Sequence, residues 1–177
     1  MAKSSGGTRN YLPPSRVWTI AEAQAEVLRV ASIIEANGGH ANKESQIAPM
    51  NIGQLPSSIR NFAKENNIEL DSNYLYFTTK GIEHSIRESK VEKGLSVTKE
   101  EIADFIANKH DMTQYYDPHK EDFIFATDKP KFIVTPNQSL KIEGKKTKVV
   151  NYITATRIKG NADDNFRTYI KIKEGKQ

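Results

Sequence analysis

The stretch DSNYLYFTTKGIEHSIRESK, residues 71–90, decides the fold, because the sequence pattern changes there from purely helical to mixed. Its first part, Tyr74–Thr78, is rich in aromatic residues and predicts a β-strand. A Lys-Gly pair follows, and the polar segment after it has the apolar spacing of a short helix over residues 81–90. We therefore expect the second half of the chain to begin with a strand that leads directly into a helix.

The residues before this stretch predict helices. Thr19 and Glu22 have the spacing of a capping box, and apolar residues then recur at helical intervals as far as Asn37-Gly38-Gly39. This pattern predicts a helix over residues 20–36, and a shorter one is expected over 57–66. Residues 1–16 have no periodicity. We expect a flexible head at 1–16, a helical extension at 17–67 and the main domain at 68–177.

The residues after this stretch predict one more helix and then strands. Thr98 and Glu101 form a second capping box, which opens a helix through about residue 108. Strands are expected at 123–125, 132–134, 140–142, 149–158 and 168–172, with turns near 128–130, 136–137, 143–145 and 159–161. The predicted fold class is α+β, with N-terminal helices followed by an antiparallel β-meander and with the helices packed on one face of the sheet.

The positive charge of the chain is concentrated in its second half. The net charge is +4, yet residues 1–73 hold seven basic and seven acidic side chains. Residues 129–173 hold eleven basic side chains against three acidic ones. A basic surface of this density favours a polyanionic partner, although a charged face that only keeps the protein in solution would give the same count.

Missing residue types and segments exclude several classes of protein. The chain has no cysteine, which excludes disulfides, thiolate zinc sites and cysteine nucleophiles. Its first residues lack the apolar segment of a signal peptide, and no run of about 18 apolar residues follows. We expect a cytoplasmic protein without a membrane partner.

His84 and Arg87 are the first candidates for chemistry, because they lie three residues apart on one face of the predicted helix over 81–90. An imidazole can move a proton near neutral pH, and a guanidinium can hold a phosphate and its developing charge. RNA supplies its own nucleophile, the 2′-OH, so this chemistry requires neither a metal nor a cofactor. Taken alone, a histidine and an arginine on a polar helix are more often ordinary surface residues.

The predicted strand over 149–158 offers further candidates. Strand alternation places Asn151 and Arg157 on one face and Thr154 and Thr156 on the other. Threonine hydroxyls can orient a phosphate or a ribose, but threonine is also simply a good strand former. Lysines at positions 90, 145, 146 and 148 are phosphate contacts or surface residues. The histidines and aspartates of residues 109–122 match no established metal-ligand spacing, so no metal site is predicted.

Two of these motifs carry a resemblance to a known family. One motif is a helix that bears His84, Arg87 and Lys90, and the other is a late strand that bears Asn151, Thr154 and Thr156. Together they resemble the phage-associated nuclease-like domains grouped with barnase, EndoU, colicin RNases and RelE-type toxins, often called the BECR fold. The resemblance covers roughly residues 68–173. It implies a metal-independent ribonuclease, a hydrolase-like toxin or effector attached to phage or mobile-element proteins.

From the residues and the resemblance together we assign two sets of site residues. The catalytic residues would be His84, Arg87, Thr154 and Thr156. The substrate-binding residues would be Lys80, Lys90, Lys148, Asn151 and Arg157.

Two other functions would involve no catalysis. A non-catalytic RNA-binding module would bind through the same basic face and leave the RNA whole. A phage structural protein with a degenerate nuclease domain would use the helix over 20–36 in an oligomer interface. As partners we expect RNA, with a cognate inhibitor or a virion protein as further candidates.

Overall fold

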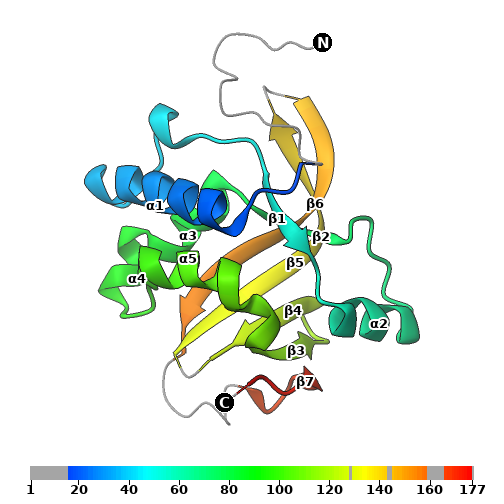
Figure 1. The fold of residues 1–177 in the computed structure, drawn as a ribbon. Coiled ribbons are helices and arrows are strands. Elements are labelled where there is room, and N and C mark those ends of the chain that lie inside the picture. The colour runs from blue at the N-terminus through cyan, green and yellow to red at the C-terminus, as the bar shows by residue number, and fades with distance from the viewer. Residues whose placement is uncertain (1–15, 128, 143–144, 159–165, 177) are drawn as a thin grey trace.

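The computed structural model describes residues 16–127, 129–142, 145–158 and 166–176, and it has an α+β fold (Figure 1). The helices are α1 (Ile20–Ala36), α2 (Ser57–Glu65), α3 (Thr79–Ile86), α4 (Glu88–Glu92) and α5 (Lys99–Asn108). The strands are β1 (Met50–Gln54), β2 (Tyr74–Phe77), β3 (Thr113–Asp117), β4 (Asp122–Ala126), β5 (Pro130–Ile142), β6 (Lys145–Arg157) and β7 (Ile170–Lys173). Both predicted capping boxes, at Thr19 and at Thr98, are formed.

All the described strands form one sheet, in the order β1-β2-β6-β5-β4-β3-β7. Strands β3 to β6 form an antiparallel meander, as predicted for this part of the chain, although β3 itself was not predicted; each of these strands pairs with the next along the chain. The sheet extends beyond the meander at both sides. β2 pairs with β6 in parallel, and β7 pairs with β3 rather than with its predecessor β6.

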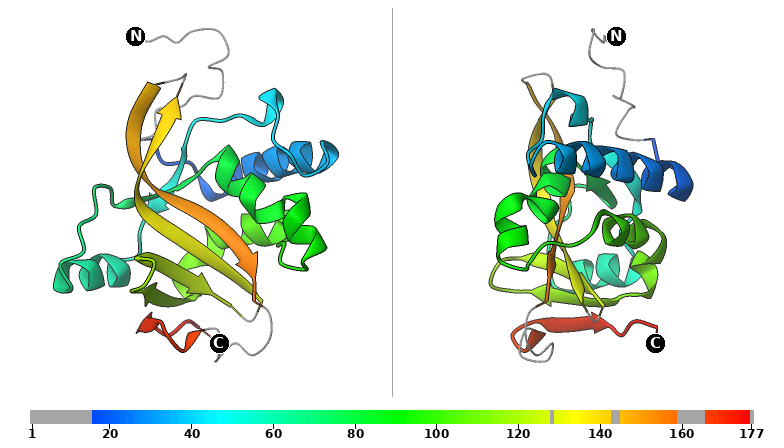
Figure 2. Two further views of the ribbon diagram at one scale, coloured as in Figure 1. Left: turned by 180° about the vertical axis from the view of Figure 1, so that it is seen from behind. Right: turned by 90° about the vertical axis from the view of Figure 1, so that its left-hand side faces the viewer.

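The core lies between one face of the sheet and the helices α1 and α5 (Figure 1). Phe105 of α5 is fully buried and stacks on Phe132 of β5, with ring centroids 4.3 Å apart. The Phe105 ring also makes edge-to-face contacts with Phe77 of β2 and Phe125 of β4, with ring centroids 6.1 and 5.3 Å apart, respectively. The other face of β5 and β6 stays open, and Figure 2 shows these long strands in front of α5 when the molecule is seen from behind. We call this surface the open face.

Residues 17–67, which the sequence predicted to be a helical extension, also contain a strand. β1 pairs with β2, and the buried side chains Val27, Met50 and Ile59 belong to the same core as Phe105. The prediction missed β1 because its sequence, MNIGQ, has neither alternation nor an aromatic or β-branched run.

Residues Pro136 and Asn137, which predicted a turn between two strands, instead lie inside the single long strand β5. The register of β5 against β6 shifts between Thr135 and Gln138, so the two residues form a bulge. Asn137 has a positive φ of 61°. Its side chain accepts a hydrogen bond from the Asp71 amide and donates one to the Glu69 carbonyl, which anchors the bulge to the loop before β2.

The segment after α5, predicted to be a loop, contains β3, and its main chain pairs with β4 and β7. Most of the predicted head and the predicted turn residues at 128, 143–144 and 159–161 lie outside the described residues. Among the helices that the structure describes, none is both long and apolar enough to cross a bilayer.

Candidate functional site

Helix α3 lies along the edge of β6 where the short strand β2 has ended. Gly81 allows this approach, because a Cβ at that position would lie 2.3 Å from the Ile153 carbonyl oxygen of β6. The Ser85 hydroxyl accepts a hydrogen bond from the Ala155 amide at 2.8 Å and donates one to the Gly81 carbonyl. α3 thereby replaces a neighbouring strand and satisfies main-chain groups of β6. These contacts between α3 and β6 fix the position of His84 relative to the sheet.

The alternation predicted for the late strand is confirmed. Asn151, Ile153 and Ala155 are buried against the core, whereas Tyr152 and Thr154 lie on the open face and are partly exposed. Ile133 and Thr135 of β5 share the open face, since they pair with Thr154 and Tyr152.

A pocket of about 450 Å³ lies on this open face. Three elements of the sheet and the helix α3 contribute to its walls. Its lining residues are Lys80, His84, Asp122, Ile133, Thr135, Gln138, Ser139, Tyr152 and Thr154. The structure thus brings three of the residues assigned from the sequence, Lys80, His84 and Thr154, into one pocket.

The environment of His84 favours the neutral imidazole. Burial lowers its pKa below the ordinary value of 6.5, and the positive charges of Arg87, Lys90 and Lys80 lower it further, in that order. Glu83 opposes the shift with a smaller effect. At neutral pH the imidazole is therefore a proton acceptor, surrounded by three cationic side chains.

Two titratable residues of the pocket, Asp122 and Tyr152, were not assigned from the sequence. Burial raises the pKa of Asp122 above its ordinary value of 3.8. A hydrogen bond from Thr135 lowers this pKa, but its effect is smaller than that of burial. Burial also raises the pKa of Tyr152 to about 12, so its phenol stays protonated and can donate a hydrogen bond. An aspartate and a tyrosine in strands carry no motif, and only the register of β4, β5 and β6 brings them opposite α3.

Arg87 and Lys90 lie beside the pocket, and the prediction that they share one helix with His84 was wrong. The helix ends at Ile86, and Arg87 is extended with ψ 157° before α4 begins. The Ser85 carbonyl, which a continuing helix would use internally, instead accepts from the Val97 amide. Within the described part of the chain, the Nε of Arg87 is buried without a hydrogen-bond partner.

Lys90 is half-buried, and its ammonium donates a hydrogen bond to the Ala155 carbonyl at 2.8 Å. Burial, followed by the charges of Arg87 and Lys131, lowers its pKa to about 8. One of its three donors is therefore used to hold α4 against β6, and its charge adds to the positive potential beside His84.

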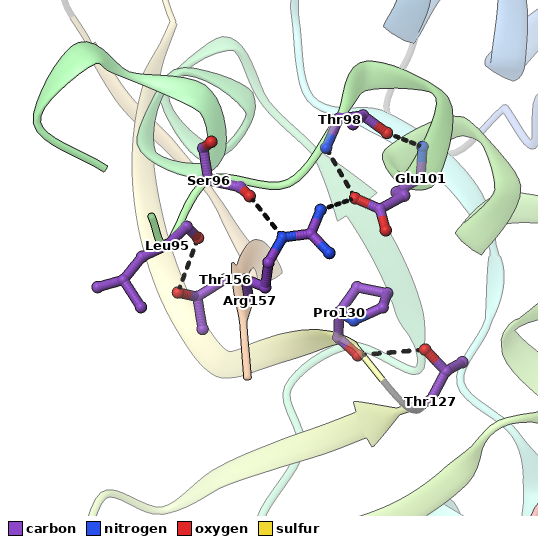
Figure 3. Close-up of polar contacts among 8 residues, drawn as sticks. All are labelled: Leu95, Ser96, Thr98, Glu101, Thr127, Pro130, Thr156 and Arg157. Carbon is purple, nitrogen blue, oxygen red and sulfur yellow. Dashed lines mark hydrogen bonds and ion pairs between the residues drawn. The ribbon is translucent and has the colours of Figure 1, made fainter. Parts of the chain in front are cut away.

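Thr156 and Arg157 hold the loop after α4 in place, as Figure 3 shows. The Thr156 hydroxyl donates to the Leu95 carbonyl at 3.3 Å. The Arg157 guanidinium donates to the Ser96 carbonyl and forms an ion pair with Glu101, which also completes the capping box of α5. Neither residue is part of the pocket lining, so their geometry gives them a structural role in place of the assigned catalytic and binding roles.

Asn151 is fully buried and faces the core, so its assignment as a substrate contact does not fit its position. Its amide group donates to the carbonyls of Ser72 and Tyr74, both at 2.7 Å, and so fixes the entry to β2. Lys148 lies in β6 opposite Leu140. Its side chain lies outside what the structure describes.

Comparison of the chain with models of known families, with curated proteins and with solved structures found no match. Among the described residues, no three histidine, aspartate or glutamate side chains converge on a position where they could hold a metal ion.

Proposed function

We propose that the chain is a metal-independent endoribonuclease of the toxin or effector kind, with its centre in the pocket below α3. The observation that carries this proposal is that His84 and Asp122, two groups able to move protons, line one pocket together with Lys80 and Thr154. A titratable pair in one concave site is the arrangement that general acid–base catalysis needs.

The reaction would be transfer of the phosphate from the 5′-oxygen of one nucleotide to the 2′-oxygen of its neighbour. The neutral imidazole of His84 removes the proton of the 2′-OH, and the 2′-oxygen attacks phosphorus. The bond from phosphorus to the 5′-oxygen breaks, and protonated Asp122 gives its proton to that oxygen. The products are a 2′,3′-cyclic phosphate and a 5′-OH end, so no water or metal enters this step.

The spacing of the two groups supports these roles. Asp122 lies on β4, two strands away from β6, and α3 lies beyond β6. Two strand spacings, about 10 Å, separate the backbones of β4 and β6, and both side chains line the one pocket above these strands, which has room for a phosphate.

The cations beside the pocket supply the binding energy and the charge stabilisation. Lys80 lines the pocket, and Arg87 and Lys90 lie close enough to lower the pKa of His84. The pentacovalent phosphorane carries more negative charge than the ground state, so fixed cations at this position stabilise the transition state more than the substrate. Thr154 and the protonated phenol of Tyr152 provide donors that can orient the phosphate or ribose.

We expect the purified chain to cleave tRNA or total cellular RNA, with the same rate in the presence and absence of EDTA. A denaturing gel of RNA incubated with and without the chelator measures this. RNA that stays intact under both conditions would overturn the proposal. If a filter-binding assay of the same samples shows salt-dependent binding, intact RNA would identify a non-catalytic RNA-binding module. Cleavage that EDTA abolishes would show a different, metal-dependent chemistry.

A further inference from the structure

Beyond the pocket, past the buried Ile124 of β4, the same face of the sheet carries a second surface of aromatic and basic side chains. The strand registers place Thr154, Ile133, Ile124 and Tyr115 in one row across β6, β5, β4 and β3. Three strand spacings separate Tyr115 from the pocket residue Thr154, or about 14 Å. The two surfaces thus lie side by side on one face of the sheet.

Three rings make up what we call the aromatic cluster: Tyr115 of β3, with Phe166 and Tyr169 from the segment before β7. Tyr115 stacks on Phe166, with centroids 4.8 Å apart and ring planes 28° apart. Tyr169 lies 5.8 Å from Phe166 and 6.0 Å from Tyr115. All three side chains are partly exposed. The cluster therefore presents aromatic surface to solvent while its own contacts hold the rings in place.

Lys131 connects the aromatic cluster with the cations of the pocket. Its ammonium donates to the Tyr169 hydroxyl at 3.2 Å and lies 5.6 Å from the centre of that ring. On the other side, its charge acts on Lys90, which in turn acts together with Arg87 on His84. Positive charge therefore runs without interruption from His84 to the aromatic cluster.

This combination matches the chemistry of single-stranded RNA. Cations spaced along a surface bind successive phosphates, and an aromatic ring gains about as much from stacking on one base as on another. A base inside a duplex has both faces stacked already and cannot reach a protein ring.

We propose that Lys131 and the aromatic cluster form a subsite that stacks an unpaired base of the RNA strand whose phosphate lies in the His84 pocket. This inference rests on the proposed function for the position of the RNA phosphate in the His84 pocket. Base stacking in the subsite can nevertheless be measured without cleavage.

The test uses the full chain carrying His84→Ala, so that the RNA survives, and labelled ten-nucleotide oligoribonucleotides in a fluorescence anisotropy titration. The probes are a single strand, the same strand with abasic positions, and the same strand in a duplex. We expect the intact single strand to bind roughly 5- to 150-fold more tightly than the abasic strand, the range that one stacked base provides. The duplex should bind more weakly than the single strand.

Variants of the subsite separate stacking from charge. Adding Tyr169→Leu should remove the preference for the intact over the abasic strand, whereas Tyr169→Phe should keep it because the ring remains. Lys131→Gln should weaken binding of both strands alike and reduce the salt dependence by about one phosphate contact. Tyr74→Leu is the matched control, since Tyr74 is also a partly exposed tyrosine but lies on β2, far along the sheet order from β3.

Equal affinity for the intact and abasic strands would overturn the inference, and this comparison needs no variant of the aromatic cluster. A Tyr169→Leu chain that folds normally and keeps the full preference would overturn it as well. If wild-type chain cleaves no RNA but the stacking preference is present, the proposed function fails and the subsite stands. If the wild-type chain cleaves RNA but shows no preference for the intact strand, the proposed function stands and the subsite inference fails.

Discussion

Replacing His84 by alanine is expected to lower kcat/KM for RNA cleavage by about 10²- to 10⁴-fold, the usual contribution of one general acid or base. His84 is only partly buried in a short helix, so its loss should change the free energy of unfolding by no more than about 0.5 kcal/mol. Initial rates on a labelled oligoribonucleotide, with urea unfolding of the same samples, measure both quantities.

His110→Ala is the matched control for this prediction. Burial lowers the pKa of His110 too, but the residue lies in the turn after α5, outside the pocket lining. It should retain the wild-type rate. Equal losses in the two variants would mean that the effect is not specific to the pocket.

The pH dependence of kcat/KM is a second readout of the same pair. His84 must be deprotonated to accept a proton, and its pKa is lowered from 6.5, while Asp122 must be protonated to donate one, and its pKa is raised from 3.8. Activity should therefore fall at low pH, where His84 becomes protonated, and at high pH, where Asp122 loses its proton, which gives a bell-shaped profile. Asp122→Asn should remove one limb of this bell. A rate that keeps rising up to pH 9 would contradict the assignment of this pair.

Replacing Phe105 by alanine is expected to cost about 3–5 kcal/mol of stability, the largest structural effect that we predict. The ring is fully buried and contacts phenylalanines from β2, β4 and β5. Small domains have a total stability of only about 5–15 kcal/mol, so the variant should unfold at much lower urea concentration. Phe62→Ala, at a partly buried position at the edge of the core, should cost clearly less.

The same experiment tests whether the two halves of the chain share one core. Trp18, the only tryptophan, packs against the core from the first half, whereas Phe105 lies in the second. Phe105→Ala should therefore shift the Trp18 fluorescence transition as far as it shifts the circular dichroism transition. A Trp18 transition that stays at the wild-type position would show that residues 17–67 fold independently.

Local signals in the sequence predicted the helices and part of the sheet. The capping boxes at Thr19 and Thr98 set the starts of α1 and α5, because a cap depends only on residues three positions apart. The bulge at Pro136 and Asn137 was read as a turn, since both residues are typical of turns and the long partner strand β6 that keeps β5 extended is a tertiary feature. β1 was missed for a similar reason, because it is a strand only through its pairing with β2.

The residues of the candidate site also differ in whether local sequence signals could identify them. His84, Lys80 and Thr154 could be proposed because each lies on an element whose alternation or periodicity is visible in the sequence. Asp122 could not, because its place in the pocket depends on the registers of three strands. Arg157 illustrates the opposite error. Its type suggested a phosphate contact, but the capping carboxylate of Glu101 is its partner in the fold.

In the proposed mechanism the 2′-OH of RNA is the nucleophile in the His84 pocket, and a change to the substrate tests this role without altering the protein. Wild-type chain is incubated with an oligoribonucleotide and with the same sequence containing only 2′-deoxyribose, and the products are identified by mass spectrometry. We predict that the ribose strand alone is cleaved and that its 5′ fragment ends in a 2′,3′-cyclic phosphate. Cleavage of both strands, or of neither, would contradict the proposed mechanism.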